Sequence, residues 1–195
     1  VILPQSLQEI ASNTFIDCPK LTSIEIPASV TDIREGAFLY CGGLESITVA
    51  EGNPVYHSAG DCIIETATGR VILCTQASVI PSDGSATTIA DGAYNANVRD
   101  EAYQLVIPSA VTTIEENAFS RRAKLTIYYH GTQAQWESVS GNDTLSTSAG
   151  SATICFYSAD DPFAAGAAEG NFWHYAKDGV TPVLWSKPED GAESA

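Results

Sequence analysis

The stretch "YHSAG" at residues 56–60 contains a histidine next to a serine. This pair of residues most often suggests hydrolytic chemistry. In a Gly-x-Ser-x-Gly motif the serine occupies a tight turn that exposes its hydroxyl, and a histidine can act as its base. Tyr56 stands where that motif has its first glycine, so the turn is not encoded. We therefore predict that His57 and Ser58 lie on a loop surface and have no catalytic role.

The other residues suited to chemistry lack the spacing that a site requires. The five cysteines form no Cys-x-x-Cys pair, and the chain has no phosphate-binding glycine motif or Asp-x-Asp-x-Asp-Gly calcium loop. His130 and His174 stand beside aromatic residues in expected strands and are predicted to pack there. Buried free thiols are the default for the cysteines, and their pairing stays open. We expect no enzyme activity, no cofactor and no metal site.

The charge of the chain restricts its partners. Acidic residues outnumber basic residues 24 to 9, for a formal net charge of −15 at pH 7. Such a surface repels phosphate groups, which excludes nucleic acid and docking on anionic membranes, and it favours a soluble monomer, with cation binding as the alternative use. No stretch reaches the ~18 consecutive apolar residues of a membrane span, so no membrane insertion is expected. The chain begins with Val and has no Met, which favours a piece of a longer protein.

An internal repeat specifies the elements that would position any site. From Pro27, apolar residues follow at offsets 3, 6, 10, 11, 14, 17 and 20. The copies that start at Pro4 and Pro108 keep these offsets except that Thr14 and Arg122 are polar and one residue is lost before Ile127. A looser copy starts at Pro81. The gaps between successive prolines are 23, 54 and 27 residues, so the long gap holds an insertion from about Asn53 to Ser78. Within it, "CIIETATGRVILC" predicts a β-hairpin in which Gly69 supplies a positive φ.

The repeat pattern predicts a stack of coils. In "LTSIEIP" and "LESITVA" alternation places apolar side chains on one face of a short strand and polar side chains on the other. The second leg, "SVTDIREGAF", is expected to bend into a single helical turn, and Phe15, Phe38 and Phe119 are expected to form one interior column. No copy can bury its apolar face alone, so the copies must stack and their ends need caps.

The C-terminal region fits a cap. "TQAQWESV" predicts a short helix with Thr132 as N-cap and Trp136 pointing inward, and "ATICFYS" predicts a strand. "NFWHYAKDGVTPVLW" predicts two strands around Lys-Asp-Gly. We expect Trp136, Trp173 and Trp185 to be core residues.

With these segments in view, the chain resembles the BspA-like leucine-rich repeat family of bacterial surface proteins. The resemblance rests on "LTSIEIPASVTDIREGAFLYCGGLESITV", "NPVYHSAGDCIIETATGRVI", "IYYHGTQAQWESV" and "NFWHYAKDGVTPVLW". It implies a right-handed solenoid with strands along a concave face, a secreted or cell-surface location, and adhesion or host-protein binding. Two residues depart from the pattern, because Arg122 replaces the usual Cys and Arg34 stands where Gly is commoner.

The repeat and the resemblance together predict an α/β fold: a strand-rich, right-handed, horseshoe-like leucine-rich repeat solenoid with short helical turns, an inserted β-hairpin and a β-rich C-terminal cap. Residues 1–130 form the solenoid with the insertion at about 53–78, residues 131–185 form the cap, and residues 186–195 form a tail or linker.

The expected function is that of a non-enzymatic protein-interaction or adhesion module that binds a protein or glycan through the solenoid surface. The candidate partner-binding residues on the concave face are Thr22, Ser23, Glu25, Glu45, Ser46, Thr48, Tyr103, Gln104 and Tyr128. One alternative is a carbohydrate-binding accessory region, favoured if aromatic rings prove coplanar and exposed. The other is a structural spacer, which predicts a featureless concave face.

Overall fold

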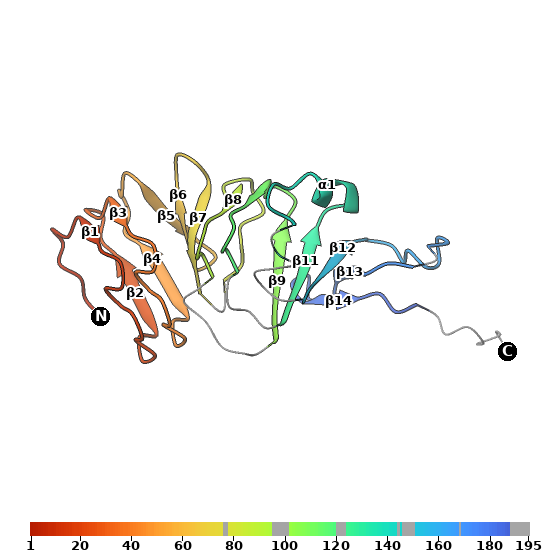
Figure 1. Ribbon diagram of the computed structural model, residues 1–195, viewed down its shortest axis with the longest axis horizontal. Helices are drawn as coiled ribbons and strands as arrows, with labels where there is room; N and C mark the ends of the chain where they lie inside the picture. The colour runs from red at the N-terminus through yellow and green to blue at the C-terminus, as the bar shows by residue number, and fades with distance from the viewer. Residues whose placement is uncertain are drawn as a thin grey trace.

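Successive coils of the chain follow one another along the long axis of the molecule, from the N-terminal coils at one end to the last described strands at the other (Figure 1). This is seen in a computed structural model, which describes residues 1–75, 78–94, 102–119, 124–143, 145, 151–167 and 169–187. Arg122 and the last eight residues of the expected tail lie outside the described residues.

The N-terminal coils contain two short strands each, and each strand pairs in parallel with its counterpart in the next coil. Strand β1 (Glu9–Ile10) pairs with β3 (Asp32–Ile33), and β2 (Ser23–Ile26) pairs with β4 (Ser46–Val49). The β2–β4 register joins Ser23 to Ser46, so residues at the same offset of the repeat lie side by side. Isoleucines and polar residues alternate along β2 between buried and exposed positions, as the predicted pattern requires.

The connections between the two legs of a coil are hydrogen-bonded turns. The Ala37 N–H donates to the Arg34 carbonyl and the Leu39 N–H donates to the Gly36 carbonyl, a three-residue spacing that does not extend into a helix. The expected helical turns are therefore tight turns at this position. Adjacent turns are joined across coils because the Phe15 N–H donates to the Ala37 carbonyl at 2.8 Å.

The insertion is an antiparallel meander of three strands, one more than the predicted hairpin. Strand β5 (Tyr56–Ala59) pairs with β6 (Cys62–Glu65), which pairs with β7 (Arg70–Cys74). Gly69 has the positive φ predicted for it, at 68°. Strand β7 then pairs in parallel with β8 (Thr88–Ile89), and β8 pairs with β10 (Thr113–Ile114), so the meander leads back into the stacked coils.

The meander separates two hydrophobic cores. Ile63 and Leu73 pack with the core of the N-terminal coils, whereas Ile64 and Val71 pack with the core of the later coils. Successive side chains of a strand point to opposite faces, so Ile63 and Ile64 pack into different cores. The β6–β7 register shifts between these two residues, and this irregularity turns Val71 and Leu73 to opposite faces.

This partition corrects the expected phenylalanine column. Phe15 and Phe38 stack with their ring centroids 5.1 Å apart in the N-terminal core. Phe119 lies in the second core, where its ring is 5.1 Å from that of Tyr94, the aromatic residue of the looser repeat copy. The inserted strands stand between the two stacks, so the interior contains two aromatic columns where the sequence predicted one.

The C-terminal part is a five-stranded mixed sheet, separate from the five-stranded sheet that contains the meander. Strands β9 (Ala102–Pro108), β11 (Lys124–His130), β12 (Ser151–Tyr157) and β13 (Phe172–Tyr175) pair in parallel, and β14 (Pro182–Leu184) is antiparallel to β13. The predicted helix is α1 (Gln133–Glu137), with Thr132 as N-cap in a capping box and Trp136 buried. Trp173 is fully buried, and Trp185 is half-buried with its Nε1 donating to the Ser158 carbonyl.

Candidate functional site

The residues that could do chemistry are not arranged for it. His57 and Ser58 lie in strand β5 and not in a loop, so their side chains leave opposite faces of the strand. The His57 Nδ1 contacts the Thr66 hydroxyl at 3.0 Å, and the Ser58 hydroxyl accepts a hydrogen bond from the Val49 N–H at 3.0 Å. Among the described residues no group of three or more His, Cys, Asp or Glu side chains could hold a metal ion.

Four of the nine predicted partner-binding residues lie on the outer face of β2 and β4, and two more, Thr22 and Glu45, directly precede these strands. Ser23 lies beside Ser46 and Glu25 lies beside Thr48, and the N–H groups of Glu45 and Ser46 both donate to the Thr22 carbonyl. All of these side chains are exposed except that of Ser46, whose hydroxyl donates to Asp61. We call this surface the β2–β4 polar face; it comprises Thr22, Ser23, Glu25, Glu45, Ser46 and Thr48.

For two of the remaining residues the prediction of partner contact is wrong, because their side chains are buried. Tyr103 is 8% exposed and faces the interior, 6.0 Å from the ring of Tyr94. Tyr128 does lie on the opposite face of the sheet from the interior core, but Trp173 covers it at a ring distance of 5.5 Å and leaves it 4% exposed. Gln104 is exposed on β9, as predicted.

The polar face ends at β4, because side chains of the meander terminate the edges of the N-terminal sheets. The Asp61 carboxylate accepts hydrogen bonds from the Ile47 N–H and the Ser46 hydroxyl. The Tyr56 hydroxyl accepts one from the Ile33 N–H of β3, at 3.2 Å. These side chains take the place of the next parallel strand, so β4 and β9 belong to different sheets and Gln104 is separated from the polar face.

A groove of about 490 Å³ lies beside β9, and the sequence contains no signal for it. Its walls come from the segment before β8 and from the turn between β13 and β14, where Val79 and Val180 are 62% and 67% exposed. We call it the β9 groove; its lining residues include Ser78, Val79, Gln104, Val106, His130, Tyr175 and Val180. No Asp, Glu, Lys or Arg of the described part of the chain lines it.

An aromatic cluster borders this groove. The rings of His130 and Tyr157 stack with centroids 4.3 Å apart and planes 27° apart. Tyr175 is tilted by 51° from Tyr157, so the rings do not form one flat platform. Burial raises the pKa of the Tyr175 hydroxyl, which keeps it protonated and able to donate a hydrogen bond near neutral pH.

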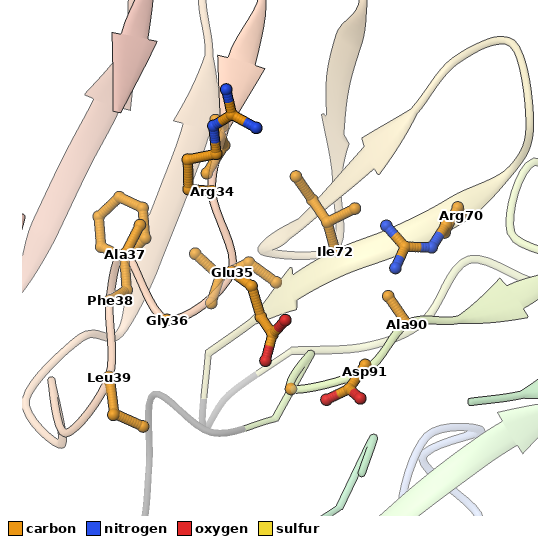
Figure 2. Close-up of a pocket in the computed structure, with 13 residues that line it drawn as sticks. Arg34, Glu35, Gly36, Ala37, Phe38, Leu39, Arg70, Ile72, Ala90 and Asp91 are labelled. Atoms are coloured by element: carbon orange, nitrogen blue, oxygen red, sulfur yellow. The ribbon is translucent and has the colours of Figure 1, made fainter. Parts of the chain in front are cut away.

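A smaller pocket of about 90 Å³ lies between the turn at 36–39 and strand β7. Figure 2 shows Arg34 and Arg70 on either side of Ile72, with the carboxylates of Glu35 and Asp91 on the same wall. The pocket occupies the position where an ordinary repeat would place its own turn, since β7 carries no such turn.

Both arginines of this pocket are engaged in ion pairs. The Arg34 guanidinium contacts Glu9 at 3.1 Å and Asp32 at 2.8 Å. Arg70 makes two 2.8 Å hydrogen bonds to Glu115, which lower the pKa of that carboxyl below its ordinary value. The arginine charges are therefore neutralised within the protein, and the described residues that line the pocket offer no free cation to an anionic ligand.

Comparison with protein families identifies the repeats. Residues 1–83 match the BspA type leucine rich repeat region, in six copies. The matched residues contain the β2–β4 polar face and the whole meander, so both belong to the BspA-type region.

Two solved bacterial structures are similar to the chain. A leucine-rich repeat protein from Eubacterium ventriosum ATCC 27560 is 20% identical, with 69% of this chain and 32% of that chain covered and a TM-score of 0.44. A leucine rich cell surface protein from Faecalibacterium prausnitzii A2-165 is 18% identical, with 71% and 55% covered and a TM-score of 0.42. The chain thus spans about a third and about half of their lengths. No curated protein matches the chain.

The described residues contain no helix with the length and apolar character needed to cross a membrane.

Proposed function

We propose that the protein is a non-enzymatic binding module of a bacterial secreted or cell-surface protein, which contacts a partner protein through the β2–β4 polar face. BspA-type repeats are associated with bacterial surface proteins, and the match over residues 1–83 supports this location. The observation that carries the proposal is the alignment of four polar residues, Ser23 with Ser46 and Glu25 with Thr48, on two adjacent strands whose opposite faces form the core, with Thr22 and Glu45 directly before these strands.

The chemistry of this face favours a basic partner. Glu25 and Glu45 are exposed, and neither carboxylate has a hydrogen bond or ion pair with a described residue. These two carboxylates therefore remain available to bind lysine or arginine side chains of a partner. Complementary charge mainly accelerates association, so binding is expected to weaken as the salt concentration rises.

The test is a pair of variants with the same change in net charge. Glu25→Lys with Glu45→Lys reverses the polar face, whereas Asp160→Lys with Glu169→Lys reverses two exposed carboxylates near the other end of the molecule. Wild type and both variants are screened for binding to immobilised matrix proteins and glycans, and their unfolding temperatures are compared. We expect lost binding in the first variant alone, with the unfolding temperature kept.

Equal loss in both variants would mean that the overall charge of the chain, and not this face, governs binding. Unchanged binding of the first variant would reject the β2–β4 polar face as the contact surface.

A second candidate function is binding of a neutral oligosaccharide in the β9 groove. The observation that favours it is an uncharged lining in which Gln104 and serine hydroxyls lie beside the rings of His130 and Tyr175. A glycan that binds wild type and the Glu25→Lys, Glu45→Lys variant equally, but not Tyr175→Ala, would favour this groove over the polar face.

A further inference from the structure

Two cysteine side chains face each other at the end of the β6–β7 ladder that is remote from the Gly69 turn. Cys62 of β6 and Cys74 of β7 are register partners in an antiparallel ladder, and their sulfur atoms are 3.2 Å apart. Both residues are fully buried. No other pair among the five cysteines makes such a sulfur–sulfur contact, although all five belong to the described part of the chain.

The backbone geometry of this pair suits a covalent bond. Directly opposed residues of an antiparallel ladder have Cα atoms about 4.5–5.5 Å apart, within the roughly 4.4–6.8 Å span of disulfides. The sulfur atoms need to approach by about 1 Å to reach the bonded distance of about 2.05 Å. Rotation of the two side chains supplies a movement of this size, so the strands can keep their register.

The position of the pair gives such a bond a structural role. Cys62 and Cys74 lie on the meander face that packs against the second core, and Ile63 and Leu73, the next register pair, face the first core. A cross-link here would fix the one element on which both cores depend. It would also hold the β5–β6 turn, whose Asp61 terminates the edge of β4.

We propose that Cys62 and Cys74 form a disulfide when the chain folds in an oxidising environment, and that this bond locks the meander between the two cores. A disulfide such as oxidised glutathione is the oxidant. One cysteine thiolate attacks it and releases one glutathione thiolate; the second cysteine thiolate then attacks the mixed disulfide and releases the other. The two cysteines lose two protons and two electrons in total, and the oxidant becomes two thiols. The inference does not depend on the proposed binding function.

The burial of the two cysteines determines whether the disulfide forms before or after the cores pack. Burial raises the pKa of the Cys74 thiol well above its ordinary value, and the thiolate is the form that reacts. Neither sulfur is accessible in the folded protein. The exchange therefore takes place while the hairpin forms, before the coils on both sides pack against it.

The experiment compares folding in the presence and absence of the oxidant. Urea-unfolded, reduced wild type is refolded in a buffer of oxidised and reduced glutathione, and a parallel sample is refolded in dithiothreitol. Both are unfolded again, alkylated and digested for mass spectrometry. We expect the first sample to contain three alkylated cysteines and a peptide pair linked through Cys62 and Cys74, and to unfold roughly 5–10 °C higher than the second.

Two controls make the result specific. Cys62→Ala refolded in the same glutathione buffer is expected to show four alkylated cysteines and no rise in unfolding temperature. Cys18→Ser with Cys41→Ser is expected to keep the disulfide. Five alkylated cysteines in refolded wild type, or a link between other cysteines, would overturn the proposal. If the disulfide formed as fast in protein that is already folded as in refolding protein, the inference that it forms before the cores pack would be overturned.

Discussion

Truncation of neighbouring residues in strand β6 tests whether the meander truly separates two cores. Ile63 and Ile64 adjoin in the chain and are both fully buried, but they pack into different cores. Replacing a buried isoleucine by alanine costs about 3 kcal/mol of unfolding free energy, from lost burial and the cavity that remains. Because the two side chains pack into different cores, although Ile72 packs against both, the double variant is expected to lose about 6 kcal/mol, with a smaller deviation from the sum than a pair within one core shows.

A second pair provides the matched control. Ile63 and Leu73 are register partners on β6 and β7 and face the same core. Their cavities would merge, so the effects of Ile63→Ala and Leu73→Ala are expected to deviate from additivity by about 1 kcal/mol or more. Free energies of unfolding come from urea titrations of the single and double variants.

The choice of probe adds a second readout. The three tryptophans all follow residue 130, so fluorescence reports on the C-terminal part, whereas circular dichroism reports on the whole chain. Ile64→Ala is expected to shift the fluorescence transition more than Ile63→Ala does. Equal coupling energies in the two pairs, or equal shifts of the fluorescence transition, would refute the separation of the cores.

Two further predictions concern contacts around the meander. Glu115→Gln removes the ion pair with Arg70 and is expected to cost about 1 kcal/mol at pH 7, since both side chains are partly exposed. The Glu115 pKa is lowered in the folded protein, so the pair stabilises above the unfolded-state pKa and this stability is lost as pH falls through the folded-state pKa. Urea titrations from pH 7 to pH 3 are expected to show a weaker pH dependence in the variant, and an unchanged dependence would contradict this. Gly69→Ala places a Cβ atom on a residue with a φ of 68°, at 2.8 Å from the Thr87 hydroxyl, and is expected to cost about 2 kcal/mol of unfolding free energy. Gly84→Ala is the control and is expected to cost less, because φ there is 90° but no atom lies within 4 Å of the added Cβ. Equal losses of thermal stability in the two variants would contradict the expected clash with Thr87.

Local features of the chain were predictable from its residues. The two-residue alternation predicted the buried and exposed faces of β2 and β4, and the Thr132 cap predicted the start of α1. The requirement for a positive φ at Gly69 likewise follows from the turn it closes. These features depend on residues close in sequence or at a fixed repeat distance, so a pattern in the chain reveals them.

Exposure of single residues at the site was less predictable. Tyr128 occupies an outer-face position of β11, yet Trp173, 45 residues later, covers it. Arg34, which departs from the repeat pattern, pairs with Asp32 of its own coil and with Glu9 of the neighbouring coil. Whether an outward side chain meets solvent depends on what folds over it, and no local pattern contains that information.

The sequence by itself determined the repeat, the stacking of its copies and the alternation that places four polar residues on β2 and β4. Tertiary structure alone decided that the insertion divides the interior into two cores, that Asp61 and Tyr56 end the N-terminal sheets, and that a groove opens beside β9. The physical reason is that strand pairing at a fixed repeat distance recurs along the chain, whereas the contacts around the insertion occur once and join segments with no periodic relation.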